Sequence, residues 1–577
     1  MRKKSIIFIV IYIFLIFFII FLIEVFLRIF NYGINTNIFI KTKYLDYYVE
    51  NPYFINKYHP GFIKEAYSDE RTIFTTKKNK NEIRCFVIGG STAQGWPYDS
   101  NHSFGKISEI FINKLLEGPF QKKERVNVYN VSYSAMSSYF IRDAAIKLLK
   151  YKPDFLIIYA GHNEYYGTFG YGSRGNYWTK NLYLRLKEFK IFQLLINILK
   201  IEKPLVDKNN KNLMAQLFAN KTFEYDEKRD KSIASDFIKN IDYVVKKYNR
   251  YKIPVIFVSP ISNLISMPPF KGKDDDKYKD LIYNYLSVIN KRDKEGILKF
   301  YKETEGIKDN ANILYLRAMS ELVLKLKEDK DILLSFINAK DRDLIPFRAR
   351  NILVDKLREY ANSKKYYNFY FIDLEKEYFE SAGLMGFTNN YFVDHLHFNF
   401  DGQFFLSYFI VKKFFEIHSY RDFGNLIEAY NSADIKKLKK FIFFTDLNEL
   451  YVESTISSLT KKPPYDKMLI SYSSPSLISS DNELLKDKEL IETLNKERDW
   501  KNVFGIVVNY YLDKKEYNKA IEYVNSFIFS YPGKYEGYYK RAQIYELIGE
   551  IEQAKEDYKI AYLLSGKKKE LKNKFVD

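Results

Sequence analysis

Three short motifs in this sequence carry side chains that can do chemistry together. Ser91 comes directly after the apolar run 85–88 and a pair of glycines. Asn163 stands in a Gly-His-Asn-Glu motif, and a later Asp-His-Leu-His motif runs from Asp394 to His397. A hydroxyl, an imidazole and a carboxylate are the components of a nucleophilic acyl-transfer site. The residue types therefore predict serine chemistry, provided that the fold brings the motifs together.

The chemistry assigns a role to each residue. A serine hydroxyl is a poor nucleophile until a base takes its proton, and His397 is the candidate base for Ser91. Asp394 precedes it by three residues, so its carboxylate can orient the imidazole and stabilise the charged form. Attack on an acyl carbon creates an oxyanion that needs donors already aimed at it. The candidates are the backbone amides of Ser91 and Ala135 and the side-chain amide of Asn163.

Residues beside these motifs have two interpretations each. His162 either lines the site or makes a structural hydrogen bond, and Glu164 either binds substrate or caps the following turn. Tyr165 opens an aromatic, Gly-rich stretch that forms either a sugar-stacking lid or a packed loop. His395 is an alternative base, but its use would leave the last histidine of the motif without a role. No metal-ligand spacing is present elsewhere, so we expect neither a metal nor another cofactor.

The order of these motifs resembles the SGNH hydrolases, also called the GDSL family. The resemblance covers about residues 83–415. It implies a flavodoxin-like, three-layer α/β/α domain, an acyl-serine intermediate, and the catalytic roles given above. The motifs that carry it are Gly89-Gly90-Ser91-Thr92, the small-residue turn 130–138, Gly161-His162-Asn163 and Asp394-His395-Leu396-His397.

The chain departs from the family pattern at two positions. Gly90 stands where the family usually has aspartate, which removes an accessory polar group but no member of the triad. Ala135 stands where an oxyanion glycine is usual, and this change concerns the geometry of the turn more than its amide donor. Together with Pro-Phe-Arg-Ala at 346–349 and the repeats described below, the motifs resemble a membrane-anchored bacterial branch of the family.

The elements that must position these motifs follow an alternating pattern between residues 83 and 416. Short apolar segments predict strands at 84–88, 126–131, 155–159, 255–258 and 370–372. Amphipathic segments predict helices at 104–116, 139–149, 233–248, 349–360 and 402–415. Asn399 or Asp401 is placed to cap the last helix. This alternation predicts a parallel sheet with helices on both faces, whose strand ends share one crevice.

Other parts of the chain predict separate units. The purely helical stretch 283–343 is expected to be an insertion in the α/β domain. Residues 501–568 align with themselves at a spacing of 34, which is typical of tetratricopeptide repeats and predicts an all-α C-terminal region. The expected units are an anchor at 1–29, a juxtamembrane segment at 30–80, the α/β domain at 81–424, a helical linker at 425–500 and two repeats at 501–568.

The N-terminus predicts a membrane anchor. Arg2, Lys3 and Lys4 precede eighteen uncharged residues, 6–23, and no small-residue cleavage site follows. With the basic residues kept inside, the remaining chain is expected outside the cytoplasm, periplasmic or extracellular. The single cysteine, Cys85, lies in an apolar run and is expected to be an inert core residue.

The distribution of charge along the chain argues against a role in nucleic-acid binding. The formal net charge is +19, but the lysines are spread along the chain and alternate with acidic residues.

Our leading hypothesis is a serine esterase that removes O-acetyl or other short acyl groups from a cell-envelope glycan or lipid. The alternatives are an O-acyltransferase that uses the same triad, and an inactive membrane-tethered scaffold. In each case the repeats are expected to offer a surface for a protein partner.

Overall fold

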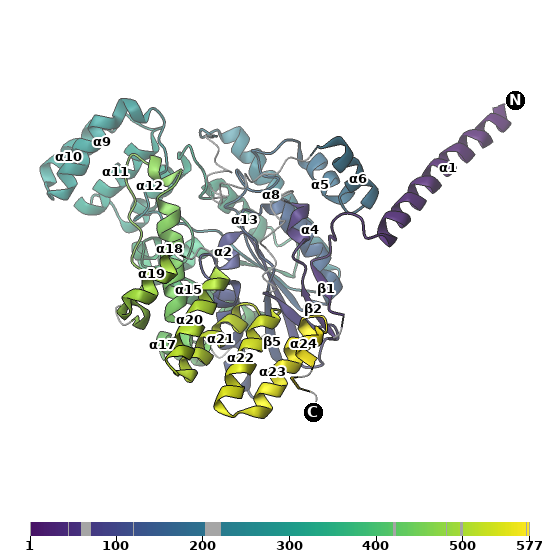
Figure 1. The fold of residues 1–577 in the computed structure, drawn as a ribbon. Coiled ribbons are helices and arrows are strands. Elements are labelled where there is room, and N and C mark those ends of the chain that lie inside the picture. Colours follow the sequence, from purple (N-terminus) through teal and green to yellow (C-terminus); the bar gives the residue numbers. More distant parts are fainter. Residues whose placement is uncertain are drawn as a thin grey trace.

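The protein was analysed as a computed structural model, which describes residues 2–43, 45–58, 71–118, 120–201, 221–418, 423–479, 482–496, 500–572 and 574–575. It is a mixed α/β structure in which helices predominate (Figure 1). Helix α1 (Arg2–Ile29) projects away from the rest of the molecule and carries the N-terminus. Its segment Ile6–Ile29 is long and apolar enough to cross a membrane.

A five-stranded parallel sheet forms the centre, in the order β5-β4-β6-β7-β8. Its strands are β4 (Glu82–Gly89), β5 (Arg125–Asn130), β6 (Phe155–Tyr159), β7 (Val255–Val258) and β8 (Phe369–Ile372). All five predicted strands are confirmed within two residues at each end. Gly89 pairs with Tyr159, and Val258 pairs with both Tyr159 and Ile372, so the carboxyl ends of four strands lie level with one another.

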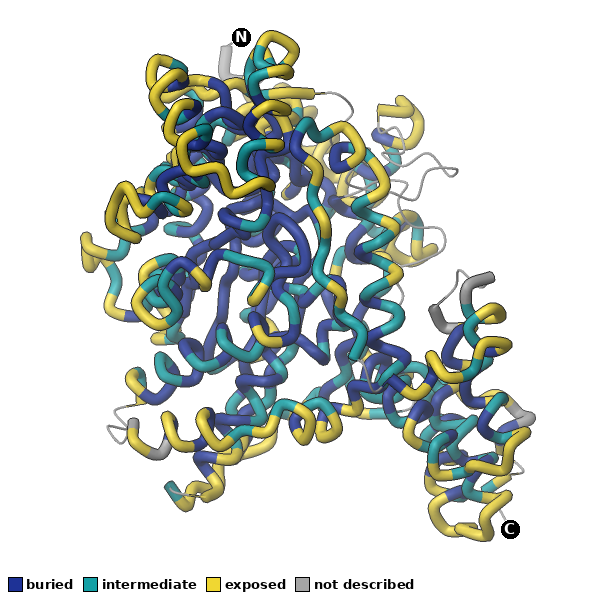
Figure 2. The backbone as a smooth tube through the Cα atoms, turned by 90° about the vertical axis from the view of Figure 1, so that its left-hand side faces the viewer, coloured by how far each residue is buried: buried dark blue, intermediate teal, exposed yellow. Residues whose placement is uncertain are grey.

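Helices cover both faces of this sheet because successive strand residues point to opposite sides. The covering helices are α3 (Phe104–Glu117), α4 (Ser138–Leu148), α8 (Glu227–Asn249), α13 (Asn351–Asn362) and α15 (Phe400–Ile417). On β4, Cys85 and Val87 belong to the core shared with α3 and α15, whereas Phe86 and Ile88 belong to the core shared with α4, α8 and α13. Figure 2 shows this buried centre in dark blue. Asn399 is the cap of α15, accepting a hydrogen bond from the amide of Gly402 at 2.8 Å.

The segment before the sheet contains three strands that the sequence did not predict. They are β1 (Phe39–Lys41), β2 (Tyr47–Glu50) and β3 (Ile73–Thr75), which pair in antiparallel fashion. Strands of three or four residues are too short to show a period of two. Phe39 and Phe74 lie about 6 Å from the ring of Phe86, so this small sheet packs on the α4 side of the central one.

The predicted helical insertion begins earlier than expected, at Asp275 rather than residue 283. Its carboxylate accepts hydrogen bonds from Gly272, Asn310 and Asn312, and this polar start hides the helix from an apolar pattern. The insertion comprises α9 (Asp275–Asn290), α10 (Lys294–Glu303), α11 (Ala311–Leu324) and α12 (Asp329–Asp341). Smaller helices elsewhere are α2 (Ser91–Gln94), α5 (Tyr177–Leu186), α6 (Lys190–Leu199) and α14 (Leu374–Ala382).

The C-terminal region contains helices and no strand among its described residues, and an irregular stretch at 468–479 separates α18 from α19. It contains α16 (Phe423–Asn431), α17 (Ile435–Phe441), α18 (Asp446–Thr460), α19 (Lys488–Lys496), α20 (Trp500–Asp513), α21 (Tyr517–Ser530), α22 (Tyr535–Ile548), α23 (Ile551–Leu564) and α24 (Lys569–Lys572). Polar contacts dock it on the loop before α3. Asn101 donates to the carbonyl of Phe529 at 2.8 Å, and Tyr531 donates to Asp99 at 3.2 Å.

Candidate active site

Ser91 is the first residue of the one-turn helix α2, which begins directly where β4 ends. Its carbonyl accepts hydrogen bonds from the amides of Gly95 and Trp96, at 3.1 and 3.0 Å, which closes a tight turn. The first amides of a helix have no acceptor within that helix, so the amide of Ser91 points out of the turn. The hydroxyl is partly exposed, whereas the flanking residues Gly90 and Thr92 are buried.

A relay of two hydrogen bonds connects the nucleophile to a buried carboxylate. Nε2 of His397 lies 2.7 Å from the hydroxyl oxygen of Ser91, and Nδ1 lies 2.7 Å from Oδ2 of Asp394. The other carboxylate oxygen accepts from the backbone amides of Leu396 and His397, at 2.9 and 2.8 Å. These bonds hold the carboxylate in place beside the imidazole. In this geometry His397 is placed to accept the proton of Ser91, and Asp394 holds the imidazole through its other nitrogen.

Asp394 is ionised at neutral pH despite complete burial. Burial opposes the charged form, but the adjacent His397 and His395 outweigh it and hold the pKa of Asp394 well below its ordinary value. A negative charge here stabilises the imidazolium that forms when His397 takes the serine proton.

His395 lies beside the relay but does not face the serine. Its Nδ1 lies 2.8 Å from the hydroxyl of Tyr465 and 3.4 Å from Asp394. Burial lowers the pKa of His395, so the ring is neutral at physiological pH. Of the two histidines in the motif, His397 is the one that the structure brings to Ser91.

The oxyanion candidates converge on the same turn. Asn163 donates from Nδ2 to the carbonyl of Met136 at 3.0 Å, which leaves its second amide hydrogen for another acceptor. A Cβ placed on Gly90 would lie only 2.3 Å from this nitrogen, so the amide group lies against the backbone directly before Ser91. A side chain at position 90 would therefore require the Asn163 amide to move, whereas glycine lets it keep this position.

Ala135 adopts a left-handed conformation, with φ of 60°. This is the conformation that glycine takes without cost and that an alanine takes at a cost of about 1 kcal/mol. Its carbonyl accepts from the amide of Thr168 at 2.8 Å, and the neighbouring Ser134 donates to the side chain of Gln94 at 3.1 Å. The turn therefore contacts both the Asn163 loop and α2, and it keeps the shape that the usual glycine would give it.

The position of Asn163 leads to a first testable prediction. We expect Asn163→Ala to lower kcat for ester hydrolysis by about 10²- to 10³-fold, the usual cost of one oxyanion donor. KM should change little, because the donor acts on charge that develops only in the transition state. Steady-state kinetics on a nitrophenyl ester would measure both parameters. An unchanged kcat would exclude Asn163 from the oxyanion site.

Each of the three candidate substrate-binding residues makes hydrogen bonds to other parts of the fold. His162 accepts at Nδ1 from the amide of Ala349 at 3.2 Å, and burial holds its pKa well below the ordinary value. Tyr165 donates to Asp230 at 2.6 Å and is buried. Glu164 accepts from the amide and the hydroxyl of Ser138, both at 2.8 Å. It therefore caps α4, which precedes it, and not the turn that follows it.

Glu164 gives a pH-dependent prediction. Burial raises the pKa of this carboxyl to about 7, above the unfolded value of about 4.3. Folding therefore favours the protonated form, and the stability that this contributes is present at pH 4 and is lost as the pH rises to 7. We expect Glu164→Gln to gain about 3 kcal/mol of unfolding free energy relative to the wild type between pH 4.5 and 8. Urea titrations of the full chain in detergent would measure this difference.

The matched control for this prediction is Glu305→Gln, which changes an exposed glutamate on the insertion. Its stability relative to the wild type should not vary with pH. If the difference in unfolding free energy between Glu164→Gln and the wild type is also independent of pH, the capping carboxyl is ionised in the folded protein across this range.

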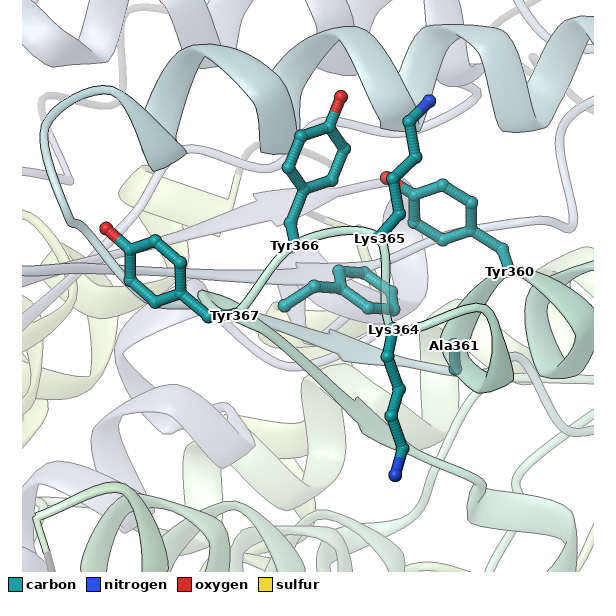
Figure 3. Close-up of a pocket in the computed structure, with 7 residues that line it drawn as sticks. Tyr360, Ala361, Lys364, Lys365, Tyr366 and Tyr367 are labelled. Carbon is teal, nitrogen blue, oxygen red and sulfur yellow. The ribbon is translucent and has the colours of Figure 1, made fainter.

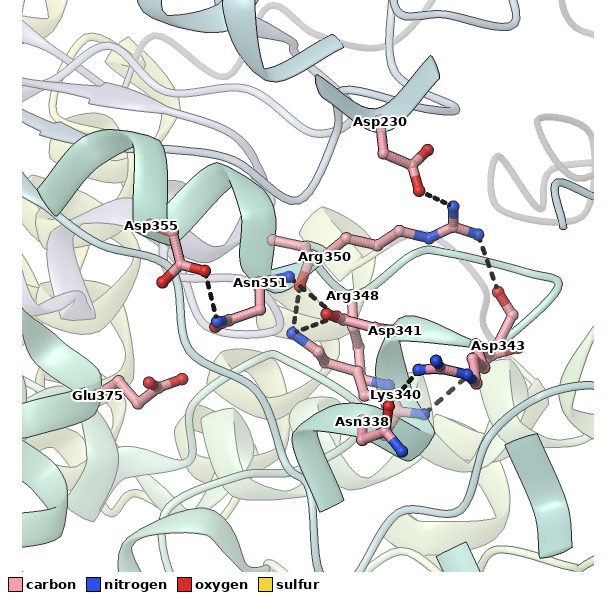
Figure 4. A network of polar contacts seen from close by, with 12 residues as sticks. Asp230, Asn338, Lys340, Asp341, Asp343, Arg348, Arg350, Asn351, Asp355 and Glu375 are labelled. Atoms are coloured by element: carbon pink, nitrogen blue, oxygen red, sulfur yellow. Dashed lines mark hydrogen bonds and ion pairs between the residues drawn. The ribbon is translucent and has the colours of Figure 1, made fainter. Parts of the chain in front are cut away.

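Residues outside the candidate triad hold the loop that carries Asp394 and His397. Asn263, which follows β7, donates from its side chain to the carbonyl of Asp394 at 3.0 Å, and its amide donates to the carbonyl of His395 at 3.1 Å. Arg348 in turn donates to the carbonyl of Asn263 at 3.0 Å and contacts Asp343 at 3.3 Å (Figure 4). This is the structural role of the Pro-Phe-Arg-Ala motif.

The C-terminal linker also contacts the catalytic loop. The hydroxyl of Tyr465 contacts His395, as described above. The hydroxyl of Tyr472 donates to the carbonyl of Val393 at 3.0 Å. Trp96 lies over the ring of His397 with centroids 4.3 Å apart. The tyrosines of the linker follow no local pattern that predicts such contacts. Trp96 could be found only by its closeness to Ser91 in the sequence.

Among the described residues, one group of metal-ligand type gathers within 4.8 Å: Asp394, His395 and His397. The Nδ1 atoms of both histidines face the carboxylate, and Nε2 of His397 faces the serine. These donors are thus paired with one another and with the nucleophile, as a proton relay requires.

A separate hollow of about 370 Å³ lies far from these residues in the fold. Tyr360, Lys364, Tyr366 and Phe369 are among the side chains that line it (Figure 3). Phe369 begins β8, so the hollow is at the amino end of the sheet, whereas Ser91 follows a carboxyl end. The hollow is therefore not part of the candidate active site.

Comparison of the sequence with protein-family models finds no match, and comparison with curated proteins finds no significant relative.

Proposed function

We propose that this chain is a membrane-anchored serine esterase of the SGNH type that hydrolyses acyl esters through an acyl-serine intermediate. The observation that carries the proposal is the continuous relay from Ser91 through His397 to Asp394, with both contacts at 2.7 Å. Ser91 and His397 are 306 positions apart in the chain, yet they meet in the arrangement that activates a serine hydroxyl.

The reaction follows from the positions of these atoms. The Ser91 oxygen attacks the acyl carbon while its proton passes to Nε2 of His397, and the carbonyl electrons move onto the oxygen. The amides of Ser91, Ala135 and Asn163 stabilise this oxyanion. Its collapse breaks the ester bond, and the leaving alcohol takes the proton from His397. Water then repeats the sequence on the acyl-serine, which releases the carboxylic acid and restores the enzyme.

The strand order supports the family assignment within this proposal. The order β5-β4-β6-β7-β8 corresponds to the 2-1-3-4-5 order of flavodoxin-like sheets, in which ligands bind at the carboxyl ends beside the first strand. Ser91 follows that first strand. The departures at Gly90 and Ala135 are compatible with activity, because each position keeps the backbone geometry that the site needs.

The substrate class in this proposal is an acylated glycan or lipid of the cell envelope. Its support is helix α1, with Arg2, Lys3 and Lys4 at the end that the positive-inside tendency keeps in the cytoplasm. The α/β domain then faces the periplasm or the exterior. Trp96, partly exposed beside His397, offers an aromatic surface next to the scissile bond. We further propose that the repeat-like helices α20 to α23 bind a protein partner.

Labelling with a fluorophosphonate tests this function. The wild-type protein should be labelled and should hydrolyse a nitrophenyl acetate or butyrate, and Ser91→Ala should do neither. A wild-type protein that is inert in both assays would favour the scaffold alternative. If a glycan acceptor is added, transfer of the acyl group to it in preference to water would identify an O-acyltransferase that uses the same triad.

A further inference from the structure

Helix α6 is apolar along most of its length and exposes several of its large apolar side chains. Its fully buried residues are Gln193 and Ile196, and the glutamine bonds to the carbonyl of Lys187 at 2.8 Å. On the outer side, Leu195, Ile198 and Leu199 are exposed to 48%, 65% and 64%. These three residues lie three and four positions apart, so they form one stripe along the helix. Large apolar patches rimmed by polar residues mark surfaces that are covered by something.

The same helix is bonded to the end of the apolar helix α1 (Figure 1). The amide of Ile191 donates to the carboxylate of Glu24 at 2.8 Å, and Arg28 donates to the carbonyl of Glu188 at 3.1 Å. Just beyond α1, Tyr32 accepts from the side chain of Asn197 at 3.0 Å. The stripe is thus held at the level at which α1 meets the folded domain.

The length of α1 places this level at the membrane surface. The uncharged stretch from Ile6 to Ile23 is eighteen residues long, or about 27 Å of helix, close to the hydrocarbon thickness of about 30 Å. Glu24 and Arg28 are the first charged residues after it, and they pair with each other at 2.6 Å. They therefore mark the boundary between acyl chains and headgroups. Glu24 is bonded to α6 itself, and Arg28 is bonded to the turn directly before α6.

We propose that α6 lies in the interface of the bilayer that α1 enters, with Leu195, Ile198, Leu199 and the adjacent Ile201 among the acyl-chain ends. The occupant of this surface is lipid, because the stripe is continuous with a membrane-spanning helix and no other described element covers it. Exposed Lys200 and Arg185 lie at the headgroup level, where cationic side chains favour anionic lipids. The domain is thus held at two points, which fixes its orientation on the membrane.

Spin labels on the full chain in lipid nanodiscs test this inference. In a Cys85→Ala background, a label at Ile198→Cys is compared with one at Leu547→Cys, a residue of α22 with a matched exposure of 62%. A third label at Leu15→Cys reports on α1. We expect the labels at 15 and 198 to be reached by oxygen more readily than by a water-soluble nickel chelate. The label at 547 should show the reverse.

Three outcomes would overturn the inference, and they can be told apart. If the label at 198 behaves like that at 547 while the label at 15 is in lipid, α1 is an anchor but α6 is not in the membrane. The inference also fails if the label at 198 is reached by neither reagent, which would mean that protein covers the stripe. If the label at 15 is in water, the membrane anchor fails together with the inference. None of these outcomes bears on the serine chemistry.

Discussion

Ser91→Ala is expected to lower kcat/KM for a short-chain nitrophenyl ester by at least about 10³-fold. The variant keeps the oxyanion donors and the base but removes the atom that attacks. The hydroxyl lies 2.7 Å from His397, and its loss leaves a space that water can enter. The hydrogen bond between His397 and Asp394 stays intact. The fold should therefore be unchanged, and the loss should appear in kcat. Steady-state kinetics in detergent micelles would measure it.

The control for this result is Ser335→Ala. That serine is half-buried on α12, and within the part of the chain that the structure describes its hydroxyl bonds to the carbonyl of Asp331 and to Lys327. Its activity should equal that of the wild type. A Ser91→Ala variant that keeps wild-type activity would assign the hydrolysis to another residue. Loss of wild-type activity on dialysis against EDTA would point instead to a metal held by Asp394 and the two histidines.

The second large effect is expected from Asp394→Asn, a loss in kcat of about 10³- to 10⁴-fold. Its Oδ1 accepts from two backbone amides, so the asparagine must keep its oxygen on that side. The amide nitrogen then faces Nδ1 of His397 and donates to it. This forces the ring into the tautomer whose Nε2 carries hydrogen, which cannot take a proton from Ser91.

Two measurements separate this mechanism from a simple loss of structure. The urea midpoint of Asp394→Asn should stay close to that of the wild type, because the amide keeps the same hydrogen-bond partners, with only the direction of the bond to His397 reversed. Asp401→Asn, in the first turn of α15, is a matched control that should keep full activity. An active Asp394→Asn variant would show that the carboxylate is not required to orient the base.

The central sheet could be predicted from the sequence because its three inner strands, β4, β6 and β7, contain apolar runs that are buried on both faces. A run such as Phe155–Tyr159 is buried throughout and admits few other interpretations. The strands β1 to β3 could not be predicted, because each is too short for a pattern. They pack against Phe86, Tyr129 and Tyr151, and these contacts depend on the whole fold.

The candidate triad could be predicted because chemistry restricts the residue types that can act together. Which histidine serves as the base followed from its position in the motif, and the distance of 2.7 Å from His397 to Ser91 agrees with that choice. The supports of the loop could not be predicted. Asn263, Arg348 and Tyr465 come from three distant segments, and their roles are hydrogen bonds to backbone or ring atoms that no local pattern encodes.

Glu164 shows a different limit. The sequence permits a carboxylate in that position to bind substrate or to cap a turn, and both roles use the same atoms. Only the fold reveals that the amino end of α4 lies within 2.8 Å of it, so the capping role depends on a contact between elements that are separated in the chain.

The most direct test of the proposed mechanism is to trap the covalent intermediate. The wild-type protein would be mixed with an activated acetyl ester, quenched in acid after a short time, digested and examined by peptide mass spectrometry. We predict an acetyl group on the peptide that contains Ser91, located on that residue by fragmentation and absent from Ser91→Ala. An acetyl group on another serine, such as Ser134, or turnover without any acylated peptide would contradict the mechanism.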